Sequence, residues 1–217
     1  MVLSPTRRAS PAFSFATRSE RRGAHAFAAL VALALPVADA GGASAEPAAA
    51  TVCAACHGEA GRSVAPAFPN LAGQQAEYLQ KQLIDFAKGR RANEVMTAAL
   101  AQVPRSEFPT LAVYYTAESP APGRIGDAAL AAAGRMIFEE GDWPAGIPPC
   151  RSCHGDRGVG SERYPRLAGQ SSAYTLQQLA DFKAGTRHND PRRMMREIAG
   201  RLSEAQMKAL AEYLAGL

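Results

Sequence analysis

The feature that most constrains this chain is a motif, Cys-x-x-Cys-His, that occurs at residues 53–57 and again at residues 150–154. A longer repeat surrounds it, since Pro-Asn-Leu-Ala-Gly-Gln at residues 69–74 returns as Pro-Arg-Leu-Ala-Gly-Gln at residues 165–170. Further positions recur at the same offset of 96 residues: Tyr78/Tyr174, Gln82/Gln178, Leu83/Leu179, Asp85/Asp181, Phe86/Phe182, Gly89/Gly185, Arg91/Arg187 and Asn93/Asn189. Self-similarity of this kind indicates one structural unit used twice.

A Pro/Gly-rich segment at residues 119–123 separates the two copies. We therefore expect a first domain over residues 46–118 and a second over residues 119–217. Domains of this size bury little apolar surface, so each needs a staple, a metal or a cofactor to be stable.

The spacing of apolar residues is helical throughout, and no alternating strand pattern occurs. Ser203 is the expected N-cap of the last helix, and Pro109 is tolerable only within the first turn of its helix. The predicted helices cover residues 75–88, 106–117, 127–139, 171–184 and 203–215. The predicted fold class is all-α.

All four cysteines of the chain lie in the two motifs. On a turn of helix, two cysteines so spaced reach the two vinyl groups of one porphyrin and form thioethers, and the following His reaches the iron. The sequence thus predicts two covalently bound haem c groups. The predicted residues are Cys53 and Cys56 with proximal His57, and Cys150 and Cys153 with proximal His154.

Three other uses of these cysteines are weaker. One structural zinc could bind four cysteines, but 93 residues separate the two pairs and each pair has its own complete repeat around it. A thioredoxin-like redox pair needs a βαβ context, which the helical pattern does not provide. Two disulfides would leave both following histidines without a role.

The second axial ligand of each iron is expected to be Met, because the first copy has no His besides the proximal one. Met96 is the only Met of that copy, and beyond Asn93 the repeat offset becomes 99, which pairs Met96 with Met195. Met194 remains the alternative to Met195, and His188 is the less favoured third choice. His–Met ligation leaves no open position on the iron, which suits electron transfer.

Residues 1–45 have the pattern of an export signal. A basic region precedes an apolar run at residues 26–36, and small-residue cleavage patterns place the cut after Ala40 or Ala45. The apolar run is too short for a membrane-spanning helix, although an uncleaved anchor is the alternative. The location expected is the periplasm.

Charge excludes a nucleic-acid partner. Removing residues 1–40 takes away five Arg and two acidic residues, which leaves 19 basic and 18 acidic residues. The net charge therefore falls from +4 to +1. This is too small a positive charge to indicate binding to the phosphate backbone of a nucleic acid.

Over residues 50–217 the chain resembles the cytochrome c4 family of dihaem c-type cytochromes. The resemblance rests on Cys-Ala-Ala-Cys-His-Gly, Pro-Asn-Leu-Ala-Gly-Gln, Tyr-x-x-x-Gln-Leu-x-Asp-Phe-x-x-Gly and the closing Leu-x-x-Tyr helices. It implies two class I cytochrome c domains related by a pseudo-twofold axis, with haem propionates facing the interface. It also implies that Pro69 and Pro165 buttress the proximal histidines, and that Tyr78 and Tyr174 lie near the domain interface.

The same resemblance implies an electron carrier between redox proteins, from a quinol-oxidising complex towards a terminal oxidase, with no small-molecule substrate. The alternative is an electron-transfer subunit of a larger dehydrogenase or oxidase complex. A dihaem enzyme is a third class, which would need an open iron. Association with a membrane surface stays open.

Two further expectations concern differences between the copies. The first copy has few mature residues before Cys53, so its first helix should span about two turns or less and its domain should be the less stable. A basic cluster surrounds Met195 and is a solvated face, a set of charges that pair with haem propionates, or a docking patch for an acidic partner. Its members are Arg187, His188, Arg192, Arg193, Arg196 and Arg201.

Overall fold

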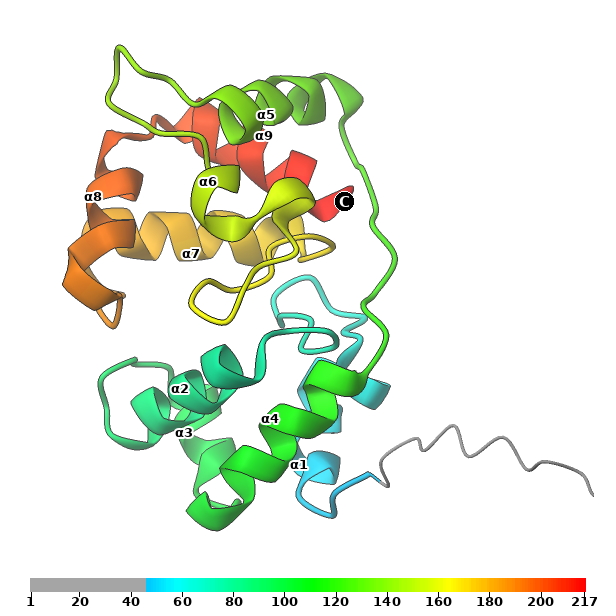
Figure 1. The fold of residues 1–217 in the computed structure, drawn as a ribbon. Coiled ribbons are helices and arrows are strands. Elements are labelled where there is room, and N and C mark those ends of the chain that lie inside the picture. Colours follow the sequence, from blue (N-terminus) through cyan, green and yellow to red (C-terminus); the bar gives the residue numbers. More distant parts are fainter. Residues whose placement is uncertain (1–45) are drawn as a thin grey trace, which may run out of the picture. The chain divides into compact units, whose positions relative to one another are not determined.

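The structure is a computed structural model that describes residues 46–217, so the export signal predicted for residues 1–45 lies outside the described residues. Figure 1 shows the helices of the described part. Their bounds are α1 (Ala50–His57), α2 (Ala76–Ala87), α3 (Glu94–Leu100), α4 (Phe108–Ala117), α5 (Ala128–Glu140), α6 (Arg151–His154), α7 (Ser172–Ala184), α8 (Met194–Arg201) and α9 (Glu204–Ala215).

The all-α prediction is confirmed. Over residues 46–217 the only β pairing consists of two isolated antiparallel bridges, Asp142 with Ile147 and Ser161 with Tyr164. The helices predicted from apolar spacing are present within one or two residues of their expected ends. The Ser203 side chain caps α9 in a capping box with Gln206, and Pro109 lies in the first turn of α4.

The internal repeat is a repeat of structure. The helices α1, α2, α3 and α4 of the first copy correspond in order to α6, α7, α8 and α9 of the second (Figure 1). The helix α5 is additional and lies ahead of the second Cys-x-x-Cys-His motif. The tandem arrangement is therefore confirmed, while the domain limits 46–118 and 119–217 stay predictions.

Each copy has its own apolar core. In the first, α4 buries Phe108, Leu111 and Tyr115 against Leu79 and Phe86 of α2. In the second, the core is formed by Phe138, Ile147, Leu202, Met207, Leu210 and Leu214. Met207 of α9 is 4 % exposed and belongs to this core.

The closest helix contact in the second copy is between α5 and α9. A Cβ atom added to Gly134 of α5 would lie 2.0 Å from the carbonyl oxygen of Ala209 in α9. Only a residue without a side chain allows this approach. Gly134 thus fixes how α5 covers the core of the second copy.

The two copies bond to each other through the repeated Pro-x-Leu-Ala-Gly-Gln segment. The backbone N–H of Asn70 donates to Gln170 Oε1 at 2.8 Å, and Gln170 Nε2 donates to the Asn70 carbonyl at 3.1 Å. At the equivalent positions the backbone N–H of Arg166 donates to Gln74 Oε1 at 2.7 Å, and Gln74 Nε2 donates to the Arg166 carbonyl at 2.9 Å. This reciprocity is the pattern expected of a pseudo-twofold pairing.

Candidate haem sites

The first candidate site is built around the end of α1. Cys53, Cys56 and His57 all lie on this helix, which ends at His57 because Gly58 follows with φ 75°. A Cβ atom at Gly58 would lie 2.2 Å from the Arg62 carbonyl oxygen, so the chain can turn away here only with glycine. The turn leaves the His57 ring at the helix terminus, pointing into its own copy, where it is 5 % exposed.

A backbone carbonyl orients the His57 ring. The ring Nδ1 lies 2.9 Å from the Pro69 carbonyl oxygen, and since a carbonyl only accepts, Nδ1 carries the proton. The other ring nitrogen, Nε2, is then left as the electron-pair donor for a metal. Phe68 packs edge-on against the ring, with centroids 6.2 Å apart.

The second candidate site reproduces this arrangement. His154 ends α6, Gly155 follows with φ 78°, and His154 Nδ1 donates to the Pro165 carbonyl oxygen at 3.0 Å. Tyr164 takes the place of Phe68, with its ring centroid 5.9 Å from that of His154. The expectation that Pro69 and Pro165 buttress the proximal histidines is thus confirmed, with the carbonyl oxygen as the contacting atom.

Both histidines are in the form that binds metals. Burial lowers the pKa of His57 and of His154, although the hydrogen bond to the proline carbonyl acts in the opposite direction. Their imidazoles are therefore neutral at pH 7. A neutral ring with one nitrogen bonded to a carbonyl is the arrangement typical of a metal-ligating His.

The cysteines are available for covalent attachment. None of the four is in a disulfide in this structure. Burial raises the pKa of Cys53, and it raises the pKa of Cys150 to about 11, so as thiols these two are protonated at neutral pH. Within residues 46–217 no three His, Cys, Asp or Glu side chains gather as a metal cluster.

The candidate methionines occupy equivalent positions. Met96 lies in the first turn of α3, is half-buried and packs on the core of the first copy. Met195 lies in the first turn of α8 and is half-buried, whereas Met194 is 37 % exposed. His188 is exposed.

These residues fit haem c. Each copy offers two thiols spaced for thioethers, a neutral His with a free ring nitrogen and a half-buried thioether on a separate helix. A small helical core beside each set supplies the apolar surface that a porphyrin needs.

Comparisons with known proteins agree with this assignment. The family model described as Cytochrome c matches residues 44–117 and again residues 131–217. Cytochrome c4 of Thiocapsa roseopersicina is 43 % identical over 169 residues, which cover 76 % of this chain and 87 % of that protein. The crystal structure of reduced recombinant cytochrome c4 from Pseudomonas stutzeri has a TM-score of 0.74 at 39 % identity, covering 77 % of this chain and 94 % of that one.

The chain belongs to the cytochrome c4 family. As a member it is an electron carrier and not an enzyme, and it carries two covalently bound haem c groups. The thiosulfate dehydrogenase electron acceptor of Thiomonas intermedia is also similar, at 41 % identity over 79 % of this chain and 81 % of that protein. Redox proteins are therefore the kind of partner that this cytochrome c4-family chain serves.

Between the two sites of this cytochrome c4-family protein lies a pair of buried arginines. Arg91 donates to Tyr174 Oη at 2.9 Å in the other copy, and Arg187 donates to Tyr78 Oη at 3.0 Å. Each guanidinium also stacks on a Phe ring of its own copy, at 4.6 Å and 4.4 Å from the centroid. Tyr78 and Tyr174 thus lie at the contact between the copies, as the resemblance implies.

The burial of these arginines corrects one expectation. Arg187 is only 8 % exposed and donates to Tyr78, so it is not part of a solvated basic face around Met195. Nearby, Asp85 is also buried and is bonded to Lys81, Arg90 and Asn189. The sequence contained a signal for these contacts between the copies, because Tyr78/Tyr174, Gln82/Gln178 and Arg91/Arg187 are identical. The repeat alone does not show that each arginine bonds to the tyrosine of the other copy.

Proposed function

We propose that this protein accepts single electrons from a periplasmic dehydrogenase or a quinol-oxidising complex and passes them to a terminal oxidase. We further propose His57 with Met96 as the axial iron ligands of the first haem, and His154 with Met195 as those of the second. The observation that carries the proposal is the duplicated His–carbonyl geometry, at 2.9 Å and 3.0 Å, together with a half-buried Met in each copy.

Each ligand residue has a separate task. Pro69 and Pro165 hold the proximal rings through their carbonyl oxygens and keep the proton on Nδ1. Met96 and Met195 supply uncharged sulfur, which disfavours the additional charge of ferric iron in a buried site. Haem c, when bound, supplies the one-electron ferric/ferrous couple.

The choice of Met195 over Met194 rests on exposure and on the repeat. Met194 is 37 % exposed, whereas Met195 and its repeat counterpart Met96 are half-buried, each in the first turn of its helix. A ligand side chain has to point into its own copy. Met195 meets that condition better than its neighbour.

The periplasmic location is supported by the sequence pattern at residues 1–45 and by the two c-type haem motifs. Over residues 46–217 we find no helix with the length and apolar character required to cross a membrane. The alternative to a diffusing carrier is a subunit of a larger dehydrogenase complex, which the similarity to a thiosulfate dehydrogenase electron acceptor favours.

The test begins with the purified holoprotein. Two haems per chain in the pyridine assay, both low-spin, and a weak ferric band near 695 nm would agree with two His–Met irons. Stopped-flow reduction by a purified quinol-oxidising complex and by a thiosulfate dehydrogenase then identifies the donor. A high-spin iron would contradict the ligand assignment, and slow reduction by both donors would contradict the proposed partners.

A further inference from the structure

The second copy carries an insertion that the first copy lacks. Two residues lie between Asn93 and Met96, whereas five lie between Asn189 and Met195. In the first copy Asn93 caps α3 directly, because its side chain accepts from the backbone N–H of Met96 at 2.9 Å. In the second copy the additional residues form the 3₁₀ turn η4 (Pro191–Arg193) ahead of α8.

The inserted turn is strained and points outward. Arg192 has φ 56° and Arg193 has φ 61°, so two consecutive residues with side chains are in the left-handed region that favours glycine. Both are exposed, and the Arg193 side chain is 67 % exposed. Strain in a segment that buries no apolar side chain indicates that its shape serves something other than packing.

A buried carboxylate fixes the turn in place. The Asp190 side chain is 2 % exposed and accepts from the backbone N–H of Arg196 at 3.1 Å and from Arg196 Nε at 2.8 Å. This pair joins the residue before the turn to the first turn of α8. The two arginines are therefore presented at a defined position a few residues before Met195.

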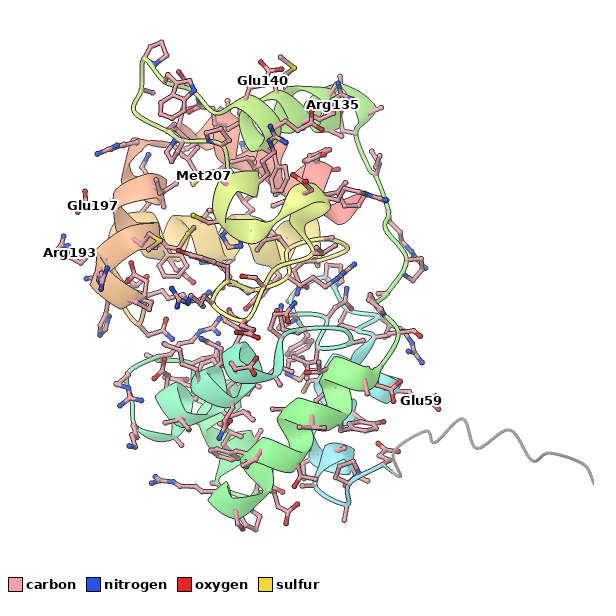
Figure 2. All side chains as sticks on the ribbon, in the orientation of Figure 1. Glu59, Arg135, Glu140, Arg193, Glu197 and Met207 are labelled. Atoms are coloured by element: carbon pink, nitrogen blue, oxygen red, sulfur yellow. The ribbon has the colours of Figure 1, made fainter. Side chains whose placement is uncertain are left out.

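The charge of the turn is largely uncompensated. Arg193 pairs with Glu197 at 3.6 Å, but both side chains are more than half exposed, and such pairs attract weakly in water. Arg192 makes no ion pair within residues 46–217. Figure 2 shows Arg193 and Glu197 at the outer edge of α8, away from Arg135 on α5.

A third exposed arginine lies beside the His154 side of the second candidate site. Arg163 directly precedes Tyr164, whose ring centroid is 5.9 Å from that of His154. Arg192 lies three residues before Met195. In the first copy Ala67 stands at the position equivalent to Arg163, and the inserted turn that carries Arg192 and Arg193 has no counterpart.

We propose that Arg192 and Arg193, with Arg163, form the docking surface through which an acidic face of a redox partner exchanges electrons at the second haem. The proposal rests on the proposed electron-carrier function. Exposed charges of one sign beside the site attract a partner of opposite charge and accelerate encounter at low salt. The partner class is therefore a redox protein with carboxylates around its electron-exit site.

The test uses the dihaem holoprotein and reduced plant-type ferredoxin, an acidic one-electron donor of low potential. At low ionic strength we expect R192Q/R193Q to lower the second-order reduction rate roughly three- to tenfold, with no difference at high salt. R192K/R193K keeps the charge and should retain the wild-type rate. R192G/R193G also removes the charge, and glycine relieves the left-handed strain. This variant should therefore fold and still be reduced slowly, even if R192Q/R193Q folds poorly.

The matched control is R124Q/R135Q, which removes two exposed charges from the same copy. The backbone N–H of Arg124 donates to the Ala215 carbonyl at the end of α9, and Arg135 lies on α5, away from Arg193 (Figure 2). An equal loss of rate in this control would assign the effect to net charge and overturn the proposal, as would an unchanged rate in R192Q/R193Q. A shifted potential of the second haem without a salt-dependent rate would mean that these arginines pair with the protein's own propionates, which also overturns it. If the charge effect appears but neither the dehydrogenase nor the quinol-oxidising complex reduces the wild type, the proposed partners fail and the docking surface stands.

Discussion

The two copies hold their haem residues in the same way on different supports. In both, a proximal His ends a helix and donates to a proline carbonyl, at 2.9 Å in the first copy and 3.0 Å in the second. Yet the first motif lies on the eight-residue helix α1, whereas the second lies on α6, which has four residues. The site geometry therefore depends on the helix end and the carbonyl, and not on the length of the helix that carries the cysteines.

What differs is the surrounding scaffold. The second copy adds α5, which packs on α9, and the turn at residues 142–147, whose Ile147 is fully buried. Among residues 46–217 the first copy has no helix before α1. The two copies thus share the geometry around the motif histidine and differ in the elements that surround it.

The largest predicted effect is on the reduction potentials of the two haems, through the proposed axial Met of each copy. M96A should lower the reduction potential of one haem, and M195A that of the other, each on the order of tenths of a volt, because the Met sulfur that favours ferrous iron is lost. Spectroelectrochemistry of the holoproteins measures both potentials. M194A is the matched control and should change neither, and a larger shift in M194A than in M195A would reverse our assignment.

The next largest predicted effect is on stability, through the packing of α5 on α9 in the second copy. G134L should destabilise the second copy by about 3 kcal/mol or more, because its Cβ would overlap the Ala209 carbonyl at 2.0 Å. Denaturant unfolding can be followed through the fluorescence of Trp143, the only tryptophan, which lies in this copy. G200A is the control: nothing lies within 4 Å of its added Cβ, so it should be neutral or slightly stabilising.

A smaller predicted effect is a difference in stability cost between D85N and D181N, the same substitution at repeat-equivalent positions. Burial alone raises the pKa of Asp85, but hydrogen bonds from Lys81, Asn189 and Arg90 outweigh it and hold the pKa below its usual value. We expect D85N to cost about 2 kcal/mol at pH 7, because two cations lose their buried partner. D181N should cost less, since amides and a hydroxyl bond the Asp181 side chain and no cation pairs with it within residues 46–217.

The sign of the pH dependence follows from the lowered pKa of Asp85. A carboxyl group whose folded-state pKa is lowered stabilises the fold above its unfolded pKa of about 3.9, and this stabilisation is lost as the pH falls through the folded value. Between pH 7 and pH 3 the free energy of unfolding should therefore fall less steeply in D85N than in the wild type. Equal slopes for D85N, D181N and the wild type would contradict the assigned role of Asp85.

The smallest expected difference is one of local stability. Amide protons of α4 should exchange roughly fivefold faster than those of α9, a difference of about 1 kcal/mol, because α5 covers α9 and no counterpart covers α4 within the described residues. Hydrogen exchange followed by mass spectrometry of the holoprotein resolves the two helices. Slower exchange in α4 would show that α5 adds no stability to its copy.

Much of the fold was predictable because its signals are local. The helices at residues 76–87 and 172–184 follow from apolar spacing that a short window contains, and Ser203 is followed after three residues by the Gln206 that completes its capping box. The exposed Met194 and half-buried Met195 agree with the preference that the repeat offset indicated, although the ligand itself stays a prediction.

The sequence by itself determined the covalent chemistry and the duplication, because Cys-x-x-Cys-His acts within one turn of helix and a repeat can be read by direct comparison. Only the tertiary structure decided that Arg187 is buried against Tyr78 of the other copy and that Arg192 is exposed on a strained turn. Both are arginines within one short basic stretch, and no local pattern distinguishes them. The difference arises because burial of a side chain depends on what a distant segment places beside it, and that is set by packing between parts of the chain far apart in sequence.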